Sequence, residues 1–158
     1  MEAKPGVLER LNDLLTIELT AINQYFVQAH MMRDWGYDAL YKKLWEFSRA
    51  EMDDAQDLVE HILYLEGLPN VQRLNLVRIG ETPLECLELD LTSEREAVEA
   101  LREVIAHCQE VGDFTSRAKA EAMIADEETH VDWLETQLET VRQIGIERYL
   151  AEQLHEEG

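Results

Sequence analysis

Apolar side chains recur at intervals of three and four residues through most of the chain, which is the period of an α-helix with one buried face. Short segments containing glycine or proline separate these stretches. The pattern predicts an all-α protein with four long helices and a short terminal helix of about ten residues. The long helices are expected at roughly 5–35, 38–66, 83–111 and 114–144.

Capping residues mark three of these boundaries. The segment 67–69 (GLP) is typical of a helix C-cap followed by a proline. The segment 82–85 (TPLE) combines a capping box with a proline at the first helical position. The pair 112–113 (GD) provides a break and then a new N-cap residue. These signals support the helix limits that the apolar period predicts.

The connections predict how the helices are arranged. The turns near 36–38 and 112–113 are short, so the first and second helices should be antiparallel neighbours, as should the third and fourth. Segment 67–81 is long for a loop and rich in leucine, valine and isoleucine, so we expect a crossover that runs along the bundle and packs upon it. The expected organisation is one four-helix bundle over 1–144 and a tail helix over 145–158.

Each apolar stripe is interrupted once, near mid-helix, by a glutamate: Glu18, Glu51, Glu94 or Glu127. Glu51 follows Glu18 by the same interval as Glu127 follows Glu94. Asp54 and His130 stand three residues after Glu51 and Glu127, on the same helix faces. Single carboxylates on two helices, and a carboxylate with a second ligand on the other two, is the pattern by which helical bundles hold two metal ions.

Electrostatics favours this interpretation over an ordinary core. Four ionised carboxylates that face one another without water would cost many kcal/mol, and protonation would need pKa values far above normal. Two divalent cations cancel the charge more completely, and glutamate with histidine suits iron, manganese or zinc. The alternative is that the four glutamates lie on solvated flanks of the stripes.

Charge and composition exclude several classes of function. The formal net charge of −20 argues against nucleic-acid binding, which needs a basic surface. There is no apolar run long enough for a membrane helix, and the first ten residues (MEAKPGVLER) contain no apolar stretch typical of a secretory signal. Cys86 and Cys108 lack the spacing of a metal site, so we expect two reduced thiols in a cytoplasmic protein.

Several motifs resemble those of the bacterioferritins, which belong to the ferritin-like superfamily. They are ELTAINQYF (18–26), EM (51–52), LEGLPN (65–70), DEETHVDWLE (126–135) and the final EEG. The resemblance covers the whole chain. It implies a ferritin-like four-helix bundle with one long crossover, a shell of 24 subunits, oxidation of Fe(II) at a two-iron centre in each subunit, and storage of ferric mineral. It also implies a small ferredoxin as the partner for iron release.

The resemblance implies the roles of the ligands. Glu51 and Glu127 would bridge the two metals, Glu18 would serve one metal, and Glu94 with His130 would serve the other. Tyr25 lies two turns from Glu18 on the same face. It could donate to a ligand or to an oxidised intermediate, or simply fill the core.

Asp54 departs from the family pattern, which has histidine at this position. The first metal would lose its nitrogen ligand, and the ligand set would carry one negative charge more than two Fe(II) ions offset. The centre could bind metal in an altered form, pass iron on to the cavity, or be a poor oxidase. We favour a bound but altered centre.

Met52 is the candidate ligand for the b-type haem that the resemblance places between two subunits. It lies one residue, about 100°, from the metal-facing stripe. Trp45, Arg49 and Met52 form a second stripe on the same helix. On the first helix, Leu19, Asn23 and Phe26 could line the same contact. The other reading is ordinary packing of a methionine.

Three functions remain open from the sequence. The first is an iron-storage oxidase. The second is a haem-carrying structural subunit with an impaired centre, which assembles with an active second type of subunit. The third is a small free-standing two-metal oxidase without a cage. His30, His61, His107 and His155 lack ligand-spaced partners and are interpreted as surface or packing residues.

Overall fold

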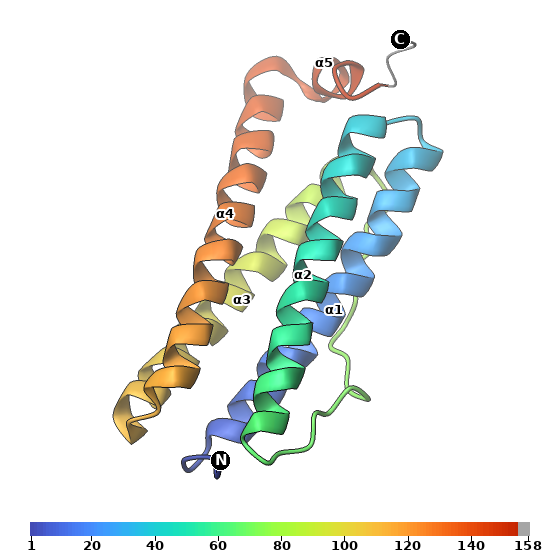
Figure 1. The fold of residues 1–158 in the computed structure, drawn as a ribbon. Helices are drawn as coiled ribbons and strands as arrows, with labels where there is room; N and C mark the ends of the chain where they lie inside the picture. The colour runs from blue at the N-terminus through green and yellow to red at the C-terminus, as the bar shows by residue number, and fades with distance from the viewer. Residues whose placement is uncertain (155–158) are drawn as a thin grey trace.

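The computed structural model describes residues 1–154, and it is an antiparallel bundle of four long helices (Figure 1). The final EEG motif and His155 lie outside these residues. The helices are α1 (Val7–Asp34), α2 (Asp38–Tyr64), α3 (Pro83–Val111), α4 (Phe114–Ile144) and the short α5 (Ile146–Ala151). The prediction of an all-α, ferritin-like bundle with a short terminal helix is confirmed. The terminal helix has six residues rather than about ten.

The helix ends follow the local chemistry that the sequence indicated. The Thr82 side chain accepts a hydrogen bond from the Glu85 amide at the start of α3. Gly112 ends α3 at a φ of 76°, a left-handed conformation that glycine adopts without steric cost. Asp113 then caps α4 by accepting from the Ser116 amide at 2.9 Å. These caps reverse the chain within two residues, which makes α3 and α4 antiparallel neighbours.

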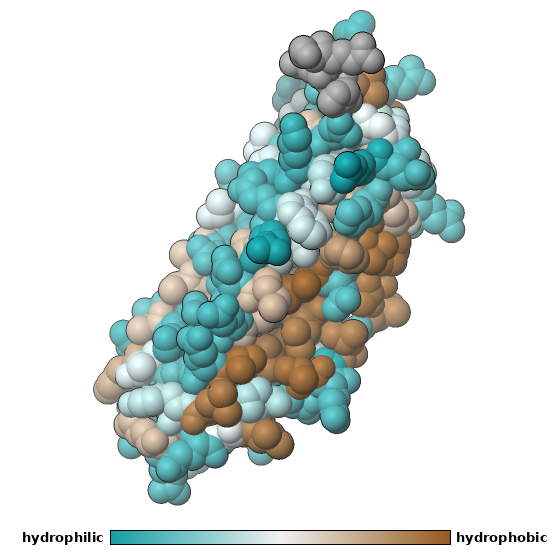
Figure 2. Space-filling model, turned by 45° about the vertical axis from the view of Figure 1, so that its right-hand side comes forward, coloured by the Kyte–Doolittle hydropathy of each residue, from teal (hydrophilic) through white to brown (hydrophobic). Residues whose placement is uncertain are grey.

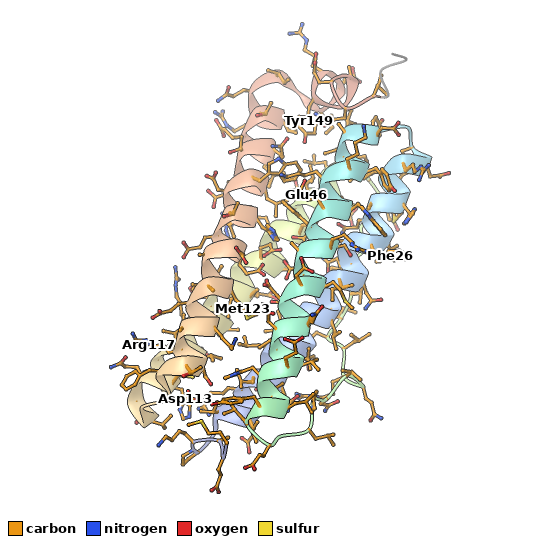
Figure 3. The ribbon with its side chains drawn as sticks, viewed as in Figure 1. Phe26, Glu46, Asp113, Arg117, Met123 and Tyr149 are labelled. Carbon is orange, nitrogen blue, oxygen red and sulfur yellow. The ribbon has the colours of Figure 1, made fainter. Side chains whose placement is uncertain are left out.

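Two apolar clusters fill the bundle, one on each side of the mid-helix glutamates. One cluster includes Leu11, Leu58 and Leu101, and the other includes Met32, Leu40, Leu87 and Leu134. The second cluster is closed at the end of the bundle by Tyr149 of α5 (Figure 3), whose hydroxyl donates to Gln137 at 2.7 Å. The glutamates therefore lie in a polar layer between two dry regions.

The crossover runs along α1, but polar contacts rather than apolar packing attach it. A column of polar side chains on α1 bonds to the crossover backbone: Asn12 accepts from the Asn70 amide, Thr20 from the Asn75 amide and Gln24 from the Arg78 amide, all within 2.8–3.0 Å. Gln28 donates to the carbonyls of Arg78 and Ile79. The column has helical spacing, so one face of α1 satisfies backbone groups that no strand or helix would satisfy.

Several apolar side chains of the crossover point away from the bundle. Leu68 is 83% exposed and Leu76 is 80% exposed, which differs from the predicted packing of these residues on the helices. Figure 2 shows apolar side chains gathered in a band on this face of the molecule. No helix within residues 1–154 is long and apolar enough to cross a membrane.

Candidate metal centre

The structure brings all six predicted metal ligands together in the polar layer at mid-bundle. Glu18 comes from α1, Glu51 and Asp54 from α2, Glu94 from α3, and Glu127 with His130 from α4; all six are buried. They form two overlapping groups, and within each group one ligand atom from every member lies within 4.8 Å of the others.

The two groups share Glu51 and Glu127. One group adds Glu18 and Asp54, and the other adds Glu94 and His130. Two groups that share two carboxylates could hold two adjacent cations, because a carboxylate has an oxygen for each side. The solvated-flank alternative is excluded for the four glutamates, since each is at most 3% exposed.

His130 faces three of the carboxylates. Its Nδ1 lies 3.1 Å from Glu51, 3.3 Å from Glu94 and 3.7 Å from Glu127. Phe47 stacks on the imidazole with ring centroids 4.0 Å apart, which restricts the orientation of the ring. The imidazole is therefore held with one nitrogen directed at the carboxylates, as a metal-ligating histidine requires.

Tyr25 connects α1 to the same layer. Its hydroxyl donates a hydrogen bond to Glu94, and its ring packs edge-on against Phe47. Burial, followed by the charge of Glu94, raises the pKa of the Tyr25 phenol well above its usual value. Tyr25 therefore remains a proton donor to this carboxylate.

The carboxylates lack enough hydrogen-bond donors. Within the described chain, five buried oxygens of Glu18, Glu51, Glu94 and Glu127 have no hydrogen-bond partner. Unpaired buried acceptors of this kind are rare and costly in folded proteins. Cations at the two positions would satisfy them, so the residues present fit a pair of metal ions.

The pKa values of the side chains at the centre also indicate that negative charge is in excess there. Burial, and then the neighbouring carboxylates, raises the pKa of Glu18 and of Glu127 well above the ordinary value. Burial works against protonation of His130, but its contacts with Glu51 and Glu94 raise its pKa to about 10. Without a cation, the centre holds protons that it must release when a metal binds.

Asp54 reaches the centre from α2 although its side chain is short. It supplies an oxygen to the group that contains Glu18, and it is only 8% exposed. Burial, followed by the charges of Glu51 and Asp126, raises its pKa to about 7. The geometry therefore allows Asp54 to serve as an oxygen ligand.

Comparison with known proteins places the chain in a family. The sequence model of the ferritin-like domain matches residues 8–144. The chain is 44% identical over 149 residues to a bacterioferritin of Brucella melitensis, with 94% of this chain and 92% of the relative covered. It is 44% identical over 152 residues to the bacterioferritin BfrA of Mycobacterium tuberculosis, with 96% of each chain covered. A bacterioferritin of Rhodobacter capsulatus is 46% identical over 145 residues, 92% of this chain and 90% of the relative.

The chain belongs to the bacterioferritin family. The resemblance inferred from the motifs is confirmed, and so is the fold that it implied. The match covers all four long helices that supply the centre, so each candidate ligand lies within the shared domain.

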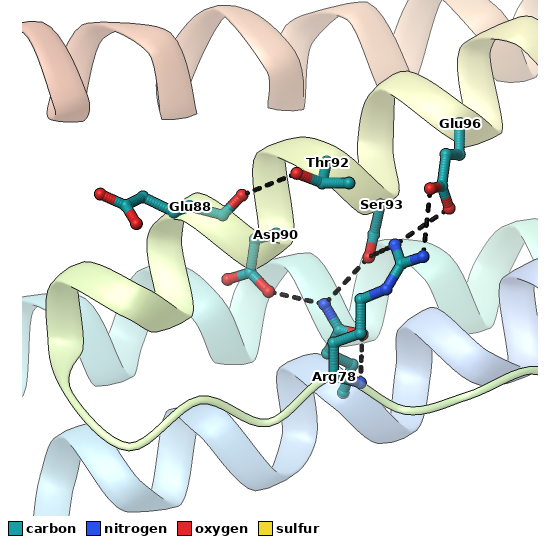
Figure 4. Close-up of polar contacts among 7 residues, drawn as sticks. Arg78, Glu88, Asp90, Thr92, Ser93 and Glu96 are labelled. Carbon is teal, nitrogen blue, oxygen red and sulfur yellow. Dashed lines mark hydrogen bonds and ion pairs between the residues drawn. The ribbon is translucent and has the colours of Figure 1, made fainter.

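Next to the candidate centre of this bacterioferritin lies a buried polar cluster that the motif analysis missed. Asp90 of α3 is fully buried, and it accepts a hydrogen bond from Gln24 at 2.8 Å. Gln24 also donates to Ser93, which accepts from Arg78 of the crossover (Figure 4). Asp90 precedes Glu94 by one helical turn, and this spacing was the available signal. Arg78 could not be found in that way, because the crossover has no periodicity, and Gln24 on α1 has no ligand-spaced acidic partner on its own helix.

Met52 lies away from the polar layer that holds the six candidate ligands, as its position on the helix predicted. Its side chain is 53% exposed on the outer side of α2. The neighbouring stripe is aromatic: the Phe26 and Trp45 rings are 5.8 Å apart, and the Arg49 guanidinium lies 6.0 Å from the centre of the Trp45 ring. Met52 is therefore exposed on the same helix that carries Trp45 and Arg49.

The other histidines that the structure describes make packing or hydrogen-bonding contacts. The His61 ring shares a 2.7 Å hydrogen bond with Ser116 in the interior, and His107 is 2.7 Å from the Pro5 carbonyl. His30 packs against the rings of Phe26 and Trp45. Cys86 and Cys108 are buried free thiols.

Proposed function

We propose that this bacterioferritin stores iron and that it oxidises Fe(II) at the six-residue centre before storage. The observation that carries the proposal is the pair of overlapping ligand groups that share Glu51 and Glu127 in a dry core. Carboxylate and imidazole ligands in this combination suit iron. Membership of the bacterioferritin family supports the storage function.

The proposed ligand assignment follows the two groups. Glu18 and Asp54 would hold one ion, Glu94 and His130 would hold the other, and Glu51 and Glu127 would contribute to both positions. When bound, two adjacent Fe(II) ions supply two electrons to one oxidant, oxygen or peroxide. Asp54 gives the site five carboxylates, one negative charge more than two Fe(II) ions offset.

The chain's own side chains manage protons around this chemistry. The raised pKa of Glu18 and Glu127 means that these groups give up protons when cations enter. Tyr25 holds a hydroxyl proton at Glu94 and keeps that carboxylate oriented. The apolar clusters keep water out of the bundle on the two sides of the layer along the helix axes.

The assembly and its partners complete the proposal. Twenty-four subunits would form the storage shell in the cytoplasm, and Met52 from each of two subunits would hold a haem b between them. The aromatic stripe beside Met52 supports that contact. A small ferredoxin would supply electrons for iron release. If the centre with Asp54 oxidises iron weakly, we propose that a second, active type of subunit assembles in the same shell.

Metal and haem content of the purified native-size particle, together with its Fe(II) oxidation rate, tests this function. Glu51→Gln should bind less iron at the centre and lose most of the initial oxidation rate. Glu60→Gln, on the exposed side of the same helix, is the matched control and should behave as the wild type. If the wild-type particle has full size and contains haem but oxidises Fe(II) no faster than Glu51→Gln, the protein is the haem-carrying structural subunit instead. A particle of dimer mass that oxidises iron would indicate the free-standing oxidase.

A further inference from the structure

Two pockets lead from the surface toward the polar layer that holds the six candidate ligands, and one of them opens between α2 and α4. A pocket of about 360 Å³ lies between these helices, and Asp54 forms part of its wall together with Asp57, Asp126 and Lys119. Met123 of the same pocket lies between α4 and α2 in Figure 3. With three aspartates against one lysine, the lining has a net negative charge.

Asp54 belongs both to this pocket and to the metal centre. It contributes an oxygen to the ligand group of Glu18, yet it also lines the pocket that opens beyond the group. It is only 8% exposed, and it makes no hydrogen bond or ion pair within the part of the chain that the structure describes. A buried carboxylate without a partner needs a cation or a proton, and here it faces an accessible pocket.

Asp57 and Asp126 extend this acidic line toward the surface. Asp57 follows Asp54 by three residues on the same face of α2, and Asp126 approaches from α4. Both side chains are exposed, and their charges contribute to the raised pKa of Asp54. They are not gathered tightly enough to join either ligand group of the described residues. That wider spacing suits a cation that keeps part of its water shell.

The other pocket lies between α1 and α3, and the crossover forms part of its wall. A pocket of about 240 Å³ reaches Glu18, Tyr25 and Glu94 from that side. Arg78 lies in its wall, and the guanidinium bonds to Glu96 at 2.9 and 3.1 Å and to Ser93 at 3.2 Å (Figure 4). This bidentate ion pair ties the crossover to α3 across the mouth of that pocket, whose other charged lining residues are the glutamates of the centre.

We propose that divalent cations reach the centre through the α2–α4 pocket, with Asp57 and Asp126 holding a hydrated cation in transit and Asp54 passing it to the paired positions. The inference rests on the proposed metal centre. With an aspartate at position 54, the acidic groups along this route, from Asp57 and Asp126 to the paired positions, are carboxylates. Oxygen ligands at wide spacing bind weakly and exchange quickly, which is what a transit site requires.

Uptake of Co²⁺ by the metal-free assembled protein tests the route without oxidation chemistry. The absorption of bound Co²⁺ reports filling of the paired positions after rapid mixing. The variant that removes both outer carboxylates, Asp57→Asn with Asp126→Asn, should fill the same number of positions about tenfold more slowly. Both residues are exposed, so the variant keeps the fold. The matched control is Glu96→Gln at the other approach, which should leave the uptake rate unchanged.

Crystals soaked in Co²⁺ give an independent readout. Anomalous scattering should show a third cation between Asp57 and Asp126 in the wild type and none there in the double variant. Unchanged uptake in the double variant, or slower uptake in Glu96→Gln alone, would overturn the proposed route while leaving the centre intact. A wild-type protein that binds no Co²⁺ at the paired positions would overturn the centre itself, and the route with it.

Discussion

The Tyr25 hydroxyl of α1 donates a hydrogen bond to Glu94 of α3, across the centre of the bundle. This contact links a buried phenol to a carboxylate that also faces His130 at 3.3 Å. Tyr25 is thus the donor that orients one of the proposed ligands, and its ring completes the apolar wall beside Phe47.

Replacing Tyr25 with phenylalanine removes this donor and little else. We expect Tyr25→Phe to retain both metals, to slow Fe(II) oxidation severalfold and to lower the free energy of unfolding by about 1–3 kcal/mol, because Glu94 loses a charge-assisted bond. Oxidation kinetics and denaturant unfolding measure the two effects. Tyr41→Phe is the control, because within residues 1–154 the Tyr41 hydroxyl has one hydrogen bond, accepted from Arg33 at 3.4 Å. Equal behaviour of both variants would assign Tyr25 to packing alone.

The second prediction concerns Asp54. Asp54→His restores the nitrogen ligand of the family pattern and removes the excess negative charge. We expect a higher initial rate of Fe(II) oxidation and about tenfold tighter binding at the position served by Glu18, since imidazole is a stronger ligand for iron. Stopped-flow absorbance and metal titration measure this. Asp53→His, at the exposed neighbouring residue, is the matched control; no change in rate or occupancy for Asp54→His would contradict the importance of this position.

The third prediction is a pH dependence of the metal-free protein. Burial and nearby acids raise the pKa of Asp54 from 3.8 to about 7, and the pKa values of Glu18 and Glu127 also rise. A carboxyl group with a raised pKa binds its proton more tightly in the folded state. Folding stability therefore falls as pH rises from about 4 through about 7. His130, with its pKa raised to about 10, changes stability in the same direction at higher pH.

Thermal unfolding between pH 5 and pH 8 measures this dependence. The midpoint of the metal-free protein should decrease toward pH 8, and added divalent cation should remove most of that decrease by replacing the protons. A midpoint that rises with pH in the metal-free protein, or that does not respond to metal, would be inconsistent with the buried carboxylate centre.

The fourth prediction concerns haem. Met52→Leu keeps the size of the side chain but removes the thioether, so the purified particle should lose the sharp Soret band while keeping its mass and its metal content. Met31→Leu, on α1, is the control and should keep the Soret band. Full haem content in Met52→Leu would exclude Met52 as the axial ligand.

Local sequence signals determined much of this molecule. The four long helices start and end within about two residues of the positions predicted from period and caps. The six residues that the structure gathers at mid-bundle were also visible in the sequence, because each apolar stripe carries one glutamate at matched depth and two of the stripes add Asp54 or His130 three residues later. The apolar period and the position of the glutamate within each stripe can both be read from residues that are close together in the sequence.

The tertiary structure decided the remainder. The crossover binds α1 through side chains such as Asn12 and Gln28 instead of its own leucines, and Arg78 reaches Ser93 and Glu96. The acidic line from Asp57 and Asp126 to Asp54 joins two helices that are distant in sequence. Such contacts depend on how irregular segments and separate helices meet in space, and no local period of the sequence carries that information.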